Sequence, residues 1–324
     1  MKTIKECVII NMVIYMNIKT IFMGTPDFAV PILETLIKNT EVMLVVSQPD
    51  AYVGRKKVLT ASPIKQCALT HNIPIFTPNN IKKEYDELKK YDIDLIVTCA
   101  YGQIVPKEVL ELPKLGCINV HASILPKYRG GAPIHHAIIN GEKETGITIM
   151  YMDIGMDTGD IISLKRIPIN KEDTVETMHD KLSQLGANLL EETLPSIIAS
   201  TNNRVKQNNE EATYAPTIKR EDEHLDFNLT AEEVFNKVRG LNSWPLANLL
   251  IDNEEIKVIE GFIDNTTNKE PGVICDIKKD AIGISCCDKV FYITKLKPFG
   301  KKAMTTKDYL NGVKKEELLG KKVK

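Results

Sequence analysis

Short apolar runs alternate with helix-patterned segments through the first half of this chain, and this alternation constrains the fold more than any other feature. The apolar runs predict buried strands, and the segments between them carry apolar residues at helical spacing. A chain of this kind forms a parallel, doubly wound α/β sheet, whose ligands bind beyond the carboxyl ends of the strands. The expected strands are 18–23, 42–46, 73–76, 93–98, 117–121, 146–152 and 160–169, and the expected helices are 28–38, 62–70, 82–90, 106–112 and 174–198.

The second half of the chain has a different pattern. A polar segment, 199–213, predicts a linker. After one expected helix, 231–239, short strand-like runs follow at 247–251, 256–263, 272–276, 281–286 and 290–296, with turn residues between them. Short strands at this spacing indicate a small β-barrel. We therefore expect an extension at 1–17, an α/β domain at 18–199, a linker at 200–213, a barrel at 214–310 and a basic tail at 311–324.

The two ends of the chain differ from the rest in composition. Lys2 and Lys5 precede the apolar run 7–16, but no small-residue cleavage site follows it. We favour a natural start at Met12 or Met16 over a targeting signal, which leaves the first residues unpacked. From Lys295 to the C-terminus ten Lys face three acidic residues, a net charge of +7. This tail is either a solvated, frayed end or a contact to phosphates.

Composition excludes several classes of protein. The formal net charge is −1, so global charge alone does not point to a nucleic-acid partner. The seven Cys form no C-x-x-C pair, and the six His lack metal spacing, so we expect reduced thiols in a cytoplasm and no metal. The chain has neither G-x-G-x-x-G nor a P-loop motif, and no apolar run long enough to span a bilayer. No nucleotide cofactor is expected.

Polar residues gather at the ends of two expected strands in the stretch 116–160. Asn119 and His121 are two residues apart, so on a strand their side chains point to the same face. Asp157 lies in a Gly-flanked turn after the next strand. An amide donor, an imidazole and a carboxylate at strand ends suit acyl-group chemistry. Each also has a structural interpretation, as a strand-end amide, a core histidine and a turn aspartate.

Two other features have both a functional and a structural interpretation. Arg55, Lys56 and Lys57 are either a solvated loop tip in the expected loop 48–63 or contacts to phosphate. Trp244, the only Trp, is expected to pack at the edge of the barrel, and the adjacent pair His135 and His136 is expected at the surface.

Several motifs lie along the chain between about Ile18 and Leu310. They are Phe22-Met23-Gly24-Thr25-Pro26-Asp27-Phe28, Gln48-Pro49-Asp50, Ala100-Tyr101-Gly102, the run 119–126, Met156 to Asp160, Leu241-Asn242-Ser243-Trp244-Pro245 and Gly300-Lys301-Lys302-Ala303-Met304. Together these motifs resemble the methionyl-tRNA formyltransferases, and the central motif is shared with other folate-dependent formyltransferases.

The resemblance implies roles for particular residues. Asn119, His121 and Asp157 match the family's catalytic trio. Ser123, Ile124, Leu125 and Pro126 match its folate-contacting segment, with Ile124 in place of the usual Leu. Arg55 matches a basic residue of a tRNA-contacting loop, together with Lys56 and Lys57. Ala51 stands where relatives often carry Arg, which weakens the expectation that this loop binds tRNA.

The same resemblance implies a function. It implies a Rossmann-like catalytic domain and an OB-like barrel that helps to hold tRNA. The chain is then expected to transfer the formyl group of 10-formyltetrahydrofolate to the amine of methionyl initiator tRNA, as a cytoplasmic monomer without metal. Two alternatives stay open: formylation of an amino-sugar nucleotide, and a non-catalytic RNA-binding protein on the same scaffold.

Overall fold

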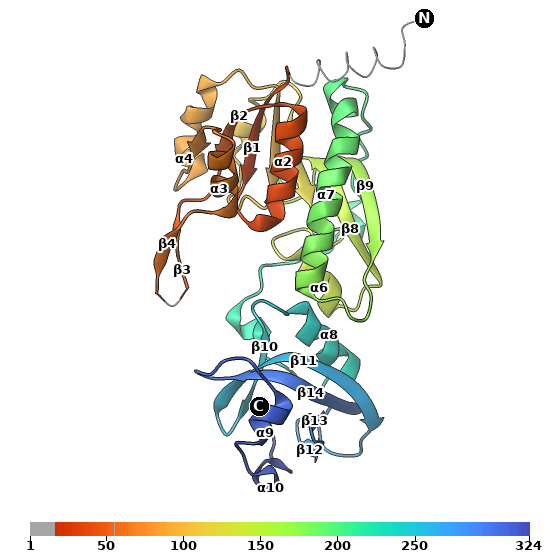
Figure 1. The fold of residues 1–324 in the computed structure, drawn as a ribbon. Coiled ribbons are helices and arrows are strands. Elements are labelled where there is room, and N and C mark those ends of the chain that lie inside the picture. The colour runs from red at the N-terminus through yellow and green to blue at the C-terminus, as the bar shows by residue number, and fades with distance from the viewer. Residues whose placement is uncertain (1–16, 55) are drawn as a thin grey trace, which may run out of the picture. The chain divides into compact units, whose positions relative to one another are not determined.

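The computed structural model describes residues 17–54 and 56–324, which form two compact units (Figure 1). The first unit takes in the described residues up to Pro133, together with Thr145–Ile167 and His179–Pro216. The second comprises Ile134–Glu144, Pro168–Met178 and Thr217–Lys324. The expected extension at 1–17 lies almost wholly outside the described residues.

The first unit contains a seven-stranded, mostly parallel sheet in the order β5-β2-β1-β6-β7-β8-β9. Its strands β1, β2, β6 and β7 consist largely of buried apolar residues, which is why the sequence predicted them. β8 pairs antiparallel with β7. The bounds are β1 Lys19–Gly24, β2 Glu41–Val46, β5 Ile75–Phe76, β6 Leu95–Cys99, β7 Cys117–His121, β8 Glu144–Tyr151 and β9 Ile161–Pro168. The predicted doubly wound α/β fold is confirmed.

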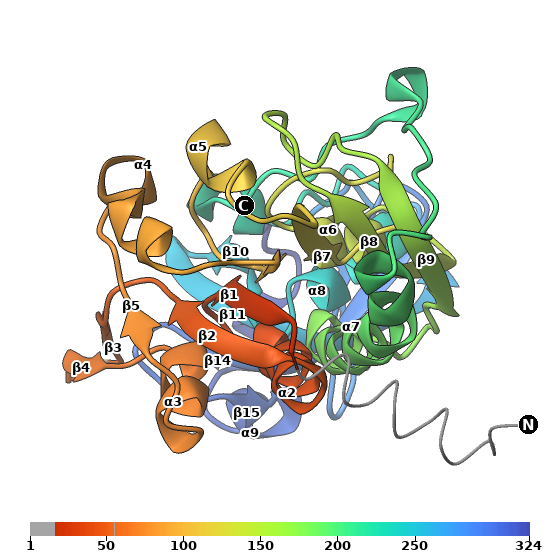
Figure 2. The same cartoon turned by 90° about the horizontal axis from the view of Figure 1, so that it is seen from above.

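Helices cover both faces of this sheet (Figure 2). α2, α3 and α7 lie along one face, and Gly186 of α7 allows that helix to approach Val120 and Ile32 closely. α4 and α5 lie along the other. The bounds are α2 Val30–Asn39, α3 Pro63–Thr70, α4 Ile81–Glu84, α5 Lys107–Leu110 and α7 Val175–Ile198. The predicted helix 82–90 is split into two elements: α4 ends at Glu84, and a 3-10 helix follows at Tyr85–Lys90.

The expected loop 48–63 contains a two-stranded hairpin, which the sequence analysis missed. β3 (Ala51–Val53) pairs antiparallel with β4 (Val58–Thr60). The hairpin projects from the first unit, and its side chains are exposed, so burial gives no strand signal there. Gly54 and Lys57 have positive φ angles of 73° and 47°, which suit the turn between the strands.

The second unit is built on six antiparallel strands, in the order β10-β11-β14-β13-β12 with β15 on β14. Register shifts along the long strand β11 let it bend around the core, as an OB-like barrel requires. The predicted class of this domain is therefore confirmed. The bounds are β10 Ala247–Ile251, β11 Glu254–Thr266, β12 Ile274–Ile277, β13 Ile282–Ser285, β14 Lys289–Pro298, β15 Met304–Thr305, α6 Pro133–Ile139, α8 Ala231–Gly240, α9 Thr306–Leu310 and α10 Lys315–Leu318.

The C-terminal segment is hydrogen-bonded into this sheet and is not a frayed end. Lys321 O accepts from Ile274 N at the start of β12, and the backbones of Lys324 and Leu250 in β10 bond to each other in both directions, at 2.6 and 3.0 Å. Val323 is buried. The last residues therefore link β12 to β10 and help to close the barrel.

Two local expectations in this unit were wrong. Trp244 is 65% exposed, although the edge of its ring meets His135 at a centroid distance of 5.9 Å. His135 is half-buried and both its ring nitrogens are buried, so its ring does not face solvent as expected.

Candidate active site

Asn119, His121 and Asp157 converge at the carboxyl end of β7. Asn119 Nδ2 donates a hydrogen bond to Asp157 Oδ1 at 3.3 Å, and His121 Nδ1 lies 3.6 Å from Asp157 Oδ2. Asn119 and His121 share a face of the strand, as their spacing predicts. The first unit therefore brings together the three residues that the sequence singled out.

The amide of Asn119 is fixed by the neighbouring strand. Thr98 pairs with Asn119 in the register of β6 and β7, and its hydroxyl oxygen lies 2.9 Å from Asn119 Oδ1. With its oxygen held there, the amide directs its N–H groups toward Asp157. The contact to Asp157 is long for a hydrogen bond, so this donor can turn to a ligand oxygen at small cost.

His121 is buried and held through its other nitrogen. Nε2 lies 3.0 Å from the carbonyl oxygen of Tyr128. A carbonyl oxygen only accepts, so Nε2 carries a proton and Nδ1 faces the carboxylate of Asp157. The distance of 3.6 Å is a close approach of the two groups without a hydrogen bond.

Asp157 sits in a strained turn, and its carboxylate is held by a backbone N–H group. Its φ of 53° lies in the left-handed region, which Asp tolerates better than most residues. Gly130 N donates to Asp157 Oδ2 at 2.9 Å. Gly130 itself has a φ of 119°, and a Cβ there would lie 2.8 Å from Ala215 O. Gly159 approaches Tyr151 O so closely that any side chain would clash. Gly159, which follows the turn, and Gly130, which donates to the Asp157 carboxylate, are thus required by geometry.

Sequence reasoning missed two residues that support this turn. Gln207 Nε2 donates to the carbonyl oxygens of Asp157 and Gly159, each at 2.8 Å. Arg129, which is buried, donates to Gln207 Oε1 from Nη2 at 2.7 Å and to Asn209 Oδ1 at 2.9 Å. Gln207 lies in the expected linker, whose polar composition gave no sign of a role at the site.

The expected folate segment forms a tight turn after β7. Ser123 and Leu125 are buried, and Ser123 Oγ donates to Lys127 O at 2.6 Å. Thr148 of β8 bonds to both Ser123 O and Leu125 N. Ile124 and Pro126 are half-buried, and these two side chains are the ones left to meet a ligand.

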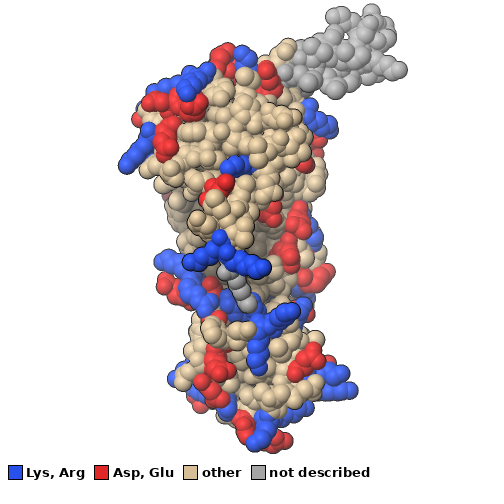
Figure 3. Space-filling model, turned by 60° about the vertical axis from the view of Figure 1, so that its left-hand side comes forward, with Lys and Arg blue, Asp and Glu red and all other residues tan. Residues whose placement is uncertain are grey.

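The remaining predicted residues lie elsewhere. Lys56 and Lys57 are exposed at the turn of the β3–β4 hairpin, and Arg55 lies outside the described residues. The face in Figure 3 shows Lys and Arg side chains gathered in several groups, with acidic side chains in others. Among the described helices, none is long and apolar enough to cross a membrane.

Comparison with known proteins identifies the class. A family model described as "Formyl transferase" matches residues 16–194, and "Formyl transferase, C-terminal domain" matches residues 217–314. Methionyl-tRNA formyltransferases of Staphylococcus epidermidis and Staphylococcus aureus are 51% and 49% identical to the chain, over 94% of its length and 98% and 99% of theirs. The chain therefore belongs to the formyl transferase family, among the methionyl-tRNA formyltransferases, as the motifs predicted. It is a formyl-group transferase.

Solved structures share the fold at low identity. An N-formyltransferase from Helicobacter canadensis, in complex with folinic acid and dTDP-3-aminofucose, is 23% identical, with a TM-score of 0.66 over 87% of this chain and all of the other. HypX from Aquifex aeolicus in complex with tetrahydrofolic acid is 16% identical, with a TM-score of 0.61 over 90% of this chain and 46% of that one.

Proposed function

We propose that the enzyme transfers the formyl group of 10-formyltetrahydrofolate to the free amine of methionyl initiator tRNA. The observation that carries this proposal is the convergence of Asn119, His121 and Asp157 beyond the carboxyl end of β7. The similarity to methionyl-tRNA formyltransferases, 51% and 49% identity over 94% of the chain, supports the choice of acceptor. A folate donor fits the folate-bound relatives of the same fold.

The reaction requires stabilisation of an oxyanion. The neutral amine attacks the formyl carbon, and the formyl oxygen then becomes negatively charged. Asn119 Nδ2 donates to that oxygen by leaving its long contact with Asp157. Nε2–H of His121 is already held by Tyr128 O, so His121 donates to that oxygen from Nδ1 once this nitrogen has received the amine proton from Asp157, whose carboxylate lies 3.6 Å away.

The proton of the attacking amine must reach the departing nitrogen of folate. When the amine bonds to the formyl carbon, its nitrogen becomes positive and loses a proton. Asp157 takes up that proton and passes it, directly or through His121, to the folate nitrogen as the carbon–nitrogen bond breaks. The products are formylmethionyl-tRNA and tetrahydrofolate, so atoms and charge balance.

The substrates would be held by segments outside the trio. Ser123, Ile124, Leu125 and Pro126 hold folate, with Ile124 and Pro126 supplying the half-exposed apolar surface and the backbone supplying polar groups. Arg55, Lys56 and Lys57 contact tRNA phosphates. The exposure of Lys56 and Lys57 on a projecting hairpin supports this role. We further propose that the enzyme is cytoplasmic and monomeric. Sedimentation with and without tRNA tests the oligomeric state.

The experiment that tests the function compares acceptors. The purified enzyme is given 10-formyltetrahydrofolate with methionyl initiator tRNA, with a methionyl elongator tRNA, or with a dTDP-amino sugar. We expect rapid transfer to the initiator alone. Faster transfer to the amino sugar would assign the enzyme to sugar formylation, and RNA binding without transfer would make it a non-catalytic RNA-binding protein.

A further inference from the structure

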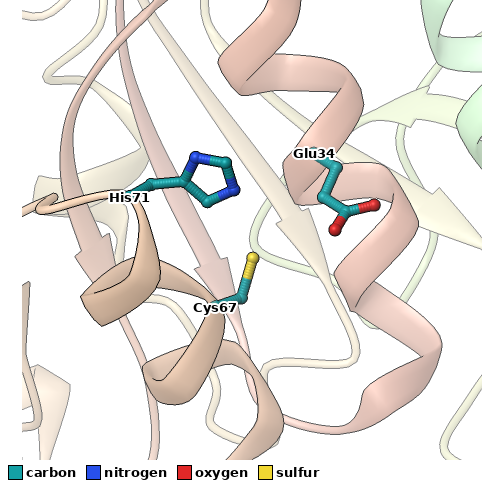
Figure 4. A group of neighbouring side chains, drawn as sticks. All are labelled: Glu34, Cys67 and His71. Carbon is teal, nitrogen blue, oxygen red and sulfur yellow. The ribbon is translucent and has the colours of Figure 1, made fainter.

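A cluster of three metal-ligand types lies on the first unit, between α2 and α3. Glu34, Cys67 and His71 each offer one ligand atom, and these three atoms all lie within 4.8 Å of one another. Figure 4 shows the imidazole, the thiol and the carboxylate pointing into one space between the two helices. None of the three belongs to the candidate active site.

Helix packing creates this cluster. Cys67 in α3 and His71 at its C-cap are four residues apart, so their side chains share one face of the helix. Ile64 and Ala68, which are fully buried, hold α3 in the core of the first unit. Glu34 projects from α2 toward the same place. Glu34 is far from Cys67 and His71 in the sequence, so the spacing of His and Cys residues did not reveal the site.

The three side chains have no other partner among the residues that the structure describes. Within the described ranges 17–54 and 56–324, no side-chain hydrogen bond or ion pair is found for these three residues. By contrast, the carboxylates of Asp86, Glu87 and Glu191 are each paired with Lys. Glu34 and His71 are exposed and Cys67 is half-buried. The carboxylate and the imidazole can therefore reorient toward a shared ion without breaking a contact.

We propose that Glu34, Cys67 and His71 bind one divalent cation of borderline softness, with zinc(II) the best match. Thiolate, imidazole and carboxylate are the ligands that zinc takes, at bond lengths of about 2.0–2.3 Å. A sulfur ligand disfavours magnesium and calcium, which take oxygen ligands. The three ligand atoms already lie within 4.8 Å of one another, so the proposal requires the exposed carboxylate and imidazole to turn toward one ion, with water in the fourth position.

Metal binding has consequences that can be measured. Burial and the nearby charge of Glu34 raise the pKa of the Cys67 thiol, so the free thiol is protonated at neutral pH. Binding therefore releases the S–H proton to solvent, and the affinity for metal falls as the pH is lowered. A bound ion also links α2 to α3 and stabilises the native state in proportion to its concentration.

The test uses cobalt(II) as a spectroscopic probe on the full-length, reduced and metal-free enzyme. A thiolate ligand gives a sulfur-to-cobalt charge-transfer band, and we expect this band to saturate at one cobalt per chain and to be displaced by zinc. Cys67→Ser should abolish the band. His71→Gln and Glu34→Gln should weaken binding about tenfold or more. Cys287→Ser, which removes an exposed thiol of the second unit, should leave the band unchanged.

Two kinds of result would overturn the proposed metal site. Absence of the band in the native enzyme, or its persistence in Cys67→Ser, overturns the proposal. Unchanged affinity in both His71→Gln and Glu34→Gln overturns it as well, and these two exposed positions keep the test valid if Cys67→Ser folds poorly. Formyl transfer should be the same with and without a chelator, so the proposed function is tested separately.

Discussion

The side-chain amide of Gln207 donates a hydrogen bond to the backbone carbonyl of Asp157 at 2.8 Å. A second bond from the same nitrogen reaches Gly159 O, and Arg129 holds the amide oxygen in place. Asp157 has a left-handed backbone conformation that costs free energy. Gln207 therefore fixes the turn that aims the carboxylate, although it lies fifty residues further along the chain.

Replacing Gln207 should slow catalysis without abolishing substrate binding. Gln207→Glu keeps an oxygen for Arg129 but cannot donate to the two carbonyls. We expect kcat to fall by up to about a hundredfold, because a displacement of about 1 Å at a reacting group has that effect. KM for the folate should change little. Steady-state kinetics of formyl transfer measure both constants.

The matched control is Asn208→Ala, at the exposed neighbouring position whose side chain bonds within its own segment. Its kinetics should equal those of the native enzyme. Native kcat in Gln207→Glu would show that the turn holds its shape without this contact.

The hydroxyl of Tyr101 is buried without a hydrogen-bond partner among the described residues, and burial raises its pKa. A buried polar atom with no partner is destabilising. Tyr101→Phe should therefore raise the free energy of unfolding by about 1 kcal/mol. Tyr292→Phe is the contrasting variant, because the Tyr292 hydroxyl bonds to Asp276 and Asn265, and its loss should destabilise. Urea unfolding measures both, and a marked loss of stability in Tyr101→Phe would reveal a hidden partner.

The C-terminal residues should contribute to stability through their backbone. Deleting residues 320–324 removes hydrogen bonds to Gly272, Ile274 and Leu250, each worth about 1 kcal/mol, and exposes the cavity that Val323 fills. We expect a lower midpoint of thermal unfolding. The double variant Lys321→Ala, Lys322→Ala keeps the backbone and removes only exposed ion pairs, so it should be nearly neutral. An equal fall of the unfolding midpoint in the deletion and in the double variant would show that the lysine charges, and not the backbone hydrogen bonds, are responsible.

Stability should fall at alkaline pH because of buried thiols. Burial raises the pKa of Cys99 above its ordinary value of 9.0, so the folded state keeps a proton that the unfolded chain loses. The unfolded state then binds fewer protons, and stability declines as the pH rises above about 9, by up to about 1.4 kcal/mol per pH unit for each such thiol. Cys99→Ala should flatten this slope in urea unfolding between pH 8 and 10, whereas Cys287→Ala should not. An unchanged slope in Cys99→Ala would contradict this explanation.

The sequence predicted the sheet well because the strands β1, β2, β6 and β7 are largely apolar runs. The hairpin at Ala51–Val53 and Val58–Thr60 was missed for the opposite reason, since its side chains are exposed and carry no burial pattern. The long helix α7 was predicted from its spacing. The split after α4 was not, and nothing in the sequence around Tyr85 explains it.

The candidate site was predictable only where local rules apply. The two-residue period of a strand places Asn119 beside His121, and turn chemistry suggests Asp157. Gln207 could not be predicted, because its contact depends on the packing of a polar segment without periodicity. The tautomer of His121 depends on Tyr128 O, a backbone atom that no side-chain pattern reveals. The proximity of Glu34 to Cys67 could not be predicted either, because it depends on how α2 packs against α3.

The most direct test of the account is the rate of formyl transfer by Asp157→Asn. This variant keeps the size of the side chain and an acceptor for Gly130 N, but it cannot take up the amine proton. With methionyl initiator tRNA and 10-formyltetrahydrofolate in single-turnover conditions, we predict a rate at least about a hundredfold below the native rate, with unchanged tRNA affinity. A near-native rate would contradict the account, because the carboxylate would then have no part in the chemistry.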